Sequence, residues 1–269
     1  MARLIHLVVV VLATGLLSAA AAQDDRDAGL DRLLDSYVRD GRVLYKALQT
    51  ERAALDRYVR SLDVVPATLA ARSPAEREAF WLNAYDALVL ETVIANYPIR
   101  GTSALYPRGS IRQIPGAFER TGHRVAGETL TLDAIEQRLL REFGDARIVL
   151  AIGRGALGSG RLRSEVFRAD RLDAQLQEAV AECAARLACV TFSREMKAIT
   201  VTPMVGWRSE AFEKSFVPAA GNRWPQRSPI ERGIAAMLLP VVLPSERDFL
   251  MEDTFRVAYG EFDWSLNEL

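Results

Sequence analysis

The stretch Phe80–Ile94 reads FWLNAYDALVLETVI and is apolar on nearly every side. A helix of this kind is predicted to lie in the middle of a domain, because every one of its faces has to be covered. The stretch nevertheless carries Asn83, Asp86 and Glu91. A polar group that is buried without a partner is strongly destabilising, so these side chains must find partners in the interior.

Asn83 and Asp86 are three residues apart and therefore project from the same side of the helix. One polar cluster or one cleft can serve both. Such a cluster either fixes how neighbouring segments dock or forms a site in which a carboxylate acts as acid or base. We favour the structural interpretation, because the sequence names no partner residue.

The rest of the chain indicates one helix-rich domain. It has 269 residues, of which 49% are hydrophobic, and no linker, repeat or low-complexity stretch interrupts residues 28–269. That length suffices for a large core. The predicted fold class is α+β, with a small β-sheet around a buried central helix.

The charge balance argues against a polyanionic partner. Lysine and arginine together number 34 and aspartate and glutamate 35, which gives a formal charge of -1. Proteins that bind nucleic acid usually carry a basic patch or an excess of positive charge. We therefore expect no nucleic acid as partner.

The first 22 residues fit a secretory signal peptide. Arg3 precedes an apolar run, Leu7–Leu17, and three alanines end the segment just before Gln23. This order is typical of a cleaved signal, so we expect export to the periplasm or the medium and no stable membrane insertion afterwards. An uncleaved anchor is the alternative, because Leu4–Ala22 approaches the length that spans a bilayer. Residues 23–39 then form a helical segment, and residues 40–269 the globular domain.

Several elements have clear boundaries. Two amphipathic helices are predicted first, and then a helix that Ser73 begins with a capping box. A hairpin that turns at Ala126-Gly127 comes before a helix that Thr131 caps. Two short strands flank Ser193–Met196, with one helix before them and three after. The helical ranges not bounded above are Ala28–Arg39, Glu51–Leu62, Leu172–Leu187, Ser209–Phe216, Ile230–Leu239 and Ser245–Met251.

The segment Arg147–Ile152 is a short apolar run that we interpret as a buried strand. The loop behind it contains a literal G-x-G-x-x-G at Gly153–Gly158. A dinucleotide-binding motif requires a helix at that point, whereas Ser159, Gly160 and several charged residues continue the loop. We therefore interpret it as a flexible loop, without a nucleotide cofactor.

Four segments of the chain are distinctive. They read FWLNAYDAL at Phe80–Leu88, ETLTLDAIEQRLLR at Glu128–Arg141, DARIVLAIG at Asp145–Gly153 and FDWSLN at Phe262–Asn267. Together they resemble the family called domain of unknown function 547, with the likeness covering about residues 40–267. The most specific marks of the family are the aromatic-Trp-x-Asn-x-Tyr pattern and the closing Asp-Trp-Ser-Leu-Asn. The resemblance implies a fold shared with exported bacterial proteins and plant proteins, and no particular activity.

The chain departs from the family pattern after the central apolar run. Relatives usually carry a histidine there, followed by two cysteines in a pattern like Cys-x-x-x-Ser-Cys-Pro. The matching positions hold Val149, Arg154, Ser159 and Gly160. Any thiol, metal or nucleophile chemistry of that pattern is therefore expected to be absent. We also predict that Arg154 pairs with Asp86.

Histidine and cysteine chemistry is scarce elsewhere. Beyond the signal, His123 is the only histidine, and we expect it to be solvated in its hairpin. A hydrolase with Ser159 and a histidine base is disfavoured, because the G-x-S-x-G pattern is missing. Cys183 and Cys189 are compatible with a disulfide or with two packed thiols, provided that Cys189 lies past the end of its helix. No metal-binding pattern is present.

Two functions stay open. One is an exported, non-catalytic protein that binds a small molecule, a glycan or a protein, with a degenerate family site. The alternative is a carboxylate-dependent hydrolase or transferase with Asp86 or Glu91 as general base. The candidate cleft or polar network consists of Asn83, Asp86, Glu91, Arg154 and Ser159.

Overall fold

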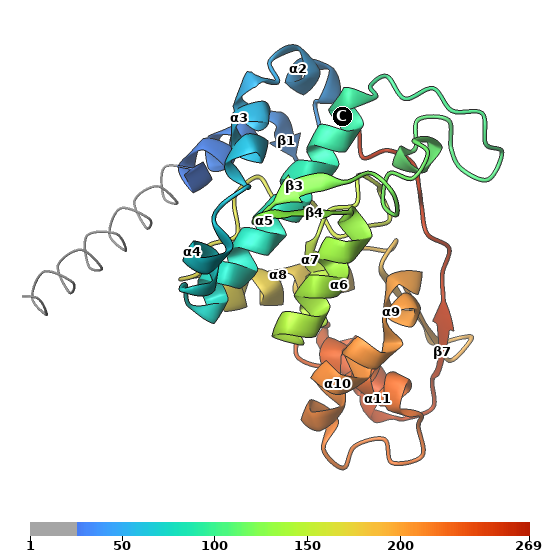
Figure 1. The fold of residues 1–269 in the computed structure, drawn as a ribbon. Coiled ribbons are helices and arrows are strands. Elements are labelled where there is room, and N and C mark those ends of the chain that lie inside the picture. Colours follow the sequence, from blue (N-terminus) through green and yellow to red (C-terminus); the bar gives the residue numbers. More distant parts are fainter. Residues whose placement is uncertain (1–25) are drawn as a thin grey trace, which may run out of the picture.

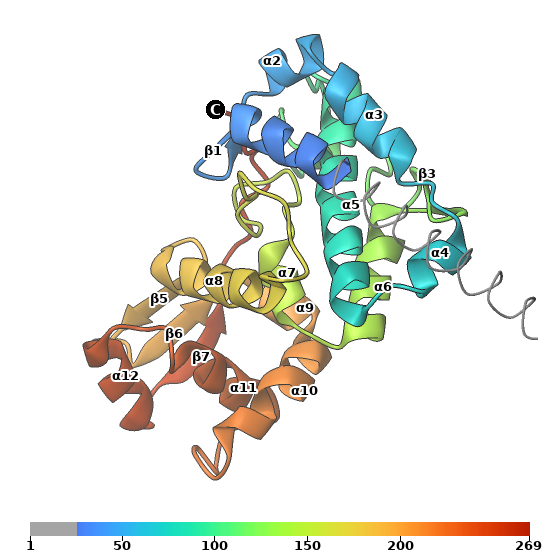
Figure 2. The ribbon, with the colours of Figure 1, turned by 90° about the vertical axis from the view of Figure 1, so that its left-hand side faces the viewer.

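The computed structural model describes residues 26–269 and shows a helix-rich α+β fold, as predicted. Its buried side chains form two apolar clusters, here called the first core and the second core. The first core surrounds helix α5 (Pro74–Ala95) and the second lies around a three-stranded sheet. Figure 2 shows this helix and this sheet in different parts of the fold. The predicted signal peptide, residues 1–22, lies outside the described residues. No helix within residues 26–269 is long and apolar enough to cross a membrane.

Helix α5 is the centre of the first core, which confirms the prediction for Phe80–Ile94 (Figure 1). It begins at a capping box in which Ser73 and Glu76 satisfy each other's backbone N–H groups. Its apolar residues face all sides, and Tyr85 and Leu88 have no exposed surface. Because no face is polar, the helix is stable only where neighbouring elements enclose it.

Elements from both sides of α5 in the sequence provide this enclosure. Helix α3 packs on α5 together with α2 and α6, and a helix at residues 26–37 adds its leucines to the same core. The hairpin of β3 and β4 turns at Ala126-Gly127, as predicted, and the Thr131 side chain caps α6. The bounds are β1 Val38–Arg39, β2 Arg42–Val43, α2 Tyr45–Thr50, α3 Ala53–Ser61, α4 Pro66–Ala70, η1 Ile111–Gln113, β3 His123–Val125, β4 Glu128–Leu130 and α6 Leu132–Phe143.

The run Arg147–Ile152 is not a strand. Its residues form the short helix α7 (Arg147–Ala151). Ile148 and Ala151 pack in the first core, whereas Val149 and Leu150 pack in the second. A short run that is apolar on all sides suits a buried helix as well as a buried strand, so periodicity does not distinguish the two.

The second core packs helices around a small sheet. Strands β5 and β6 correspond to the two predicted strands. They pair antiparallel, and β7 adds to β6 in parallel. The sequence analysis did not identify β7 or α9. The bounds are α8 Leu172–Ala185, β5 Val190–Ser193, β6 Ala198–Val201, α9 Pro203–Trp207, α10 Ser209–Ala220, α11 Pro229–Leu238, α12 Pro244–Met251 and β7 Arg256–Tyr259.

The last ten residues, 260–269, are here called the C-terminal strap. The strap leaves β7 in the second core and ends beside β2 in the first (Figure 1). Asn267 holds its end: the side-chain oxygen accepts the Tyr45 hydroxyl at 2.7 Å, and the amide donates to the Gly41 carbonyl at 2.9 Å. The strap thus joins the two cores a second time, in addition to α7.

Candidate functional site

Asp86 joins α5 to the segment after α7, here called the central loop (residues 152–171). Its Oδ1 accepts the Gly153 N–H at 2.9 Å, and only 4% of the residue is exposed. Burial raises the pKa of Asp86 to about 7, although the Gly153 N–H and the Arg154 charge act in the opposite direction. Helix α5 therefore contacts the central loop at Gly153.

Asn83 holds the far end of the same loop. Its side-chain oxygen accepts the Phe167 N–H at 2.8 Å, and its amide donates to the Phe167 carbonyl at 2.9 Å. The side chain thus satisfies both backbone groups of one residue. The two polar groups on one side of α5 bind the beginning and the end of one loop.

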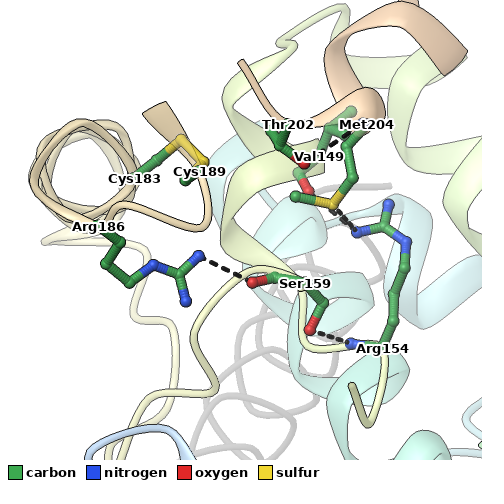
Figure 3. The surroundings of a disulfide bond; sticks show 8 residues. All are labelled: Val149, Arg154, Ser159, Cys183, Arg186, Cys189, Thr202 and Met204. Atoms are coloured by element: carbon green, nitrogen blue, oxygen red, sulfur yellow. Dashed lines mark hydrogen bonds between the residues drawn. A yellow bond between two sulfur atoms is a disulfide. The ribbon is translucent and has the colours of Figure 1, made fainter. Parts of the chain in front are cut away.

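Arg154 does not pair with Asp86, so that prediction was wrong. Its guanidinium lies 2.9 Å from Glu136 Oε1 on α6, with both side chains at most 5% exposed. The same guanidinium donates to the Val149 carbonyl and contacts the sulfur of Met204 (Figure 3). Asp86 instead takes the backbone N–H of Gly153, one residue before the arginine.

Glu136 also accepts a second arginine. Arg208, just after α9, places its Nε 3.0 Å from the same Oε1 and is 33% exposed. Burial by itself raises the pKa of Glu136, but the Arg154 and Arg208 charges outweigh it and hold the pKa below its usual value. A line of charges thus runs from the buried Arg154 to the partly exposed Arg208.

The sequence analysis missed Glu136, although a signal was present. Leu132, Ile135 and Leu139 form the buried stripe of α6, and Glu136 is four residues after Leu132. That spacing places Glu136 within the apolar stripe and not on the solvated face. A carboxylate at such a position requires a buried cation.

Ser159 is a structural residue of the central loop. It is 1% exposed, accepts the Arg154 N–H at 3.1 Å and lies 2.7 Å from the Ala156 carbonyl, to which it donates. The first part of the loop, residues 152–160, is buried apart from the partly exposed Leu157. A Cβ on Gly158 would lie 2.7 Å from the Asp263 nitrogen, so a glycine is required where the strap crosses the loop.

Cys183 and Cys189 form a disulfide with 5.2 Å between their Cα atoms. Helix α8 ends at Ala185, so Cys189 lies past the helix end and the chain curls back. Arg186 lies within the closed segment and donates to the Ser159 carbonyl at 2.9 Å (Figure 3). The disulfide therefore orients a side chain that supports the central loop.

Glu91 is not part of this network. Its Oε2 lies 3.5 Å from Nδ1 of His123 in the β3–β4 hairpin. His123 is 7% exposed, so the expectation of a solvated histidine was wrong. The alternation of β3 explains this, because His123 shares the buried face of the strand with Val125. Glu91 is five residues after Asp86 and points to a different side of α5.

Aromatic side chains gather where the line of charges reaches solvent. We define the aromatic surface as Tyr106, Trp207, Phe262 and Trp264. The ring centroid of Phe262 lies 5.0 Å from that of Trp207 and 4.4 Å from that of Trp264. Trp207 is 47% exposed. Trp264, which belongs to the closing family motif, is partly exposed beside it.

Metal ligands do not cluster in the described part of the chain. Residues 26–269 contain no group of three or more His, Cys, Asp or Glu side chains that could hold a metal ion. At this site, Arg154 and Arg208 each form an ion pair with Glu136.

The comparison with protein families identifies the class. The model of the family described as "Protein of unknown function, DUF547" matches residues 69–182, so the chain contains a domain of that family. The matched region extends from α4 into α8 and holds Asn83, Asp86, Glu136, Arg154 and Ser159. No curated protein and no solved structure matches the chain.

The Arg154–Glu136 pair predicts a strong dependence of stability on both charges. Arg154→Met should lower the free energy of unfolding by about 3–5 kcal/mol, because Glu136 then loses its buried partner. The double variant Arg154→Met, Glu136→Gln should recover part of this loss. Urea unfolding measures both effects. Arg194→Met is the control, because the exposed Arg194–Glu252 pair should contribute about 1 kcal/mol or less. If Arg154→Met and Arg194→Met lowered the free energy of unfolding by the same amount, the prediction would be contradicted.

The raised pKa of Asp86 predicts that the stability of the fold depends on pH in a specific way. An acid whose pKa rises on folding binds its proton more tightly in the folded state, so its contribution to stability falls as pH rises. The window runs from the ordinary pKa of 3.8 to about 7. Asp86→Asn should remove a slope of at most about 1.4 kcal/mol per pH unit within it. Urea unfolding at several pH values tests this, with the exposed Asp35→Asn as control; parallel curves for wild type and Asp86→Asn would refute it.

Proposed function

We propose that this chain is an exported, non-catalytic binding protein whose family site has become structural. The supporting observation is that Arg154 and Ser159, at positions where relatives are expected to carry cysteines, are 4% and 1% exposed. Their polar atoms bind Glu136, Val149 and the loop backbone. No substrate reaches groups that are enclosed and paired in this way.

The geometry speaks against the carboxylate enzyme. A carboxylate-only site needs two acids that face one cavity. Asp86 is buried against Gly153, whereas Glu91 faces the hairpin and His123. The raised pKa of Asp86 would suit a general acid or base, but the side chain is only 4% exposed. Because a substrate could not reach this side chain, we attribute the raised pKa of Asp86 to its burial in the fold and not to a catalytic role.

Export rests on the sequence. The apolar run and the alanines before Gln23 are typical of a cleaved signal, and an oxidising compartment suits the Cys183–Cys189 disulfide. We therefore place the protein in the periplasm or the medium. The partner is a small molecule, a glycan or a protein, because the formal charge of -1 does not favour nucleic acid.

Export predicts a processed N-terminus. When the full chain is expressed in a bacterium, the mature protein should begin at or near Gln23 and appear in the periplasmic or extracellular fraction. Mass spectrometry of the intact protein measures this, and a variant with Leu12→Arg in the apolar run should remain inside the cell. Soluble cytoplasmic protein that retains Met1 would refute export. A membrane-bound protein of full length would establish the uncleaved anchor instead.

The absence of catalysis is tested with the purified mature protein. Ester, phosphoester, glycoside and peptide substrates should show no turnover above the buffer blank. Asp86→Asn and Glu91→Gln are assayed beside wild type, with Asp35→Asn as the matched surface control. An activity that disappears in a folded Asp86→Asn or Glu91→Gln variant, but not in the control, would establish the enzyme and refute the binding proposal.

A further inference from the structure

The aromatic surface is built from two segments that lie far from each other in the sequence. Trp207 ends α9, whereas Phe262 and Trp264 belong to the C-terminal strap. Figure 1 shows the strap passing α9 on its way from β7 to the C-terminus. The planes of Trp207 and Trp264 differ by 15°, with 6.2 Å between their ring centroids. The two indoles are therefore nearly parallel and stacked, and Trp207 is the more exposed of the two.

These rings are held in place from behind. The strap is bound to the central loop by the Gly158 N–H, which donates to the Asp263 carbonyl at 2.9 Å, and by the Leu157 N–H, which donates to the Ser265 carbonyl at 2.9 Å. The Arg112 guanidinium lies 4.7 Å from the Trp264 ring centroid. A binding surface that is ordered in advance loses less conformational entropy when a ligand binds.

Asp133 supplies an acceptor that is linked to the rings through Phe118 and Arg112. Its backbone N–H binds the carbonyl of Phe118, whose ring centroid lies 6.1 Å from that of Trp264. The Asp133 side chain is partly exposed, and its carboxylate accepts no hydrogen bond from any residue within 26–269. Arg208 is a partly exposed donor whose charge acts on the same carboxylate.

The arginines around the aromatic surface are paired with acids. Arg112 pairs with Glu119, and Arg154 and Arg208 share Glu136. Asp133 and the exposed Glu261 and Asp263 of the strap are further acids. These arginines therefore leave no surplus positive charge that would attract an anionic ligand. Together with the acids, they do provide hydrogen-bond donors and acceptors around the flat apolar rings.

We propose that the aromatic surface binds a neutral carbohydrate, with a sugar ring stacked on the exposed Trp207 and hydroxyl groups bound by Asp133 and Arg208. A pyranose has an apolar face of C–H groups that matches an indole, and hydroxyls at its edge that match a carboxylate and a guanidinium. An exposed aromatic patch with a polar rim is the usual form of an interaction site. This inference rests on the proposed binding function and names its ligand class.

The test measures binding of defined oligosaccharides to the mature protein. Cellohexaose, chitohexaose, maltohexaose and xylohexaose are titrated by calorimetry and by tryptophan fluorescence. At least one should bind saturably, and both Trp207→Ala and Asp133→Asn should weaken that binding by about tenfold or more. Trp207→Phe should retain most of it, because a flat ring remains. Leu187→Ala is the control, since this residue is 84% exposed and lies outside the aromatic surface.

Each outcome has a separate meaning. No saturable binding of any of the four oligosaccharides overturns the carbohydrate inference and leaves the non-catalytic function standing. Binding that persists in both Trp207→Ala and Asp133→Asn overturns the location. Cleavage of a bound oligosaccharide refutes the proposed non-catalytic function, even where both variants confirm the surface. Asp133→Asn leaves the aromatic packing intact, so a folding defect of Trp207→Ala does not remove the test.

Discussion

The pair of Arg154 and Glu136 is the contact on which the arrangement of the central loop depends. Both side chains are almost completely buried, at a 2.9 Å separation. Charges in such surroundings are tolerated only when they are paired and hydrogen-bonded. The backbone of Arg154 is then held by Ser159, and its neighbour Gly153 by Asp86. The loop therefore has one low-energy path between α7 and α8.

The same contacts explain how one chain encloses two cores. Helix α7 packs into both, and the central loop lies directly after it. The disulfide supports the loop from the second core through Arg186, and the strap crosses it at Gly158. Because the interior around Arg154 is closed, a ligand can bind only at the surface. The aromatic rings of the strap and α9 are among the groups that lie at the surface.

Local signals in the sequence were sufficient for much of the fold. The capping box at Ser73, the hairpin at Ala126-Gly127 and the Thr131 cap depend on residues within a few positions of one another. The burial of α5 followed from its lack of a polar face. The need for partners at Asn83 and Asp86 followed from the same argument, and both bind the loop after α7.

The identities of the distant partners were decided by the tertiary structure. A helical periodicity indicates which residues share a face but not which element will cover that face. The sequence therefore could not show that Arg154 pairs with Glu136 and not with Asp86. The short run at α7 was ambiguous for the same reason, and His123 was buried against a helix from an earlier part of the sequence. What the sequence by itself determined is local hydrogen bonding and the burial of apolar faces. Which charges meet across the core depends on how those faces pack, and no local pattern records it.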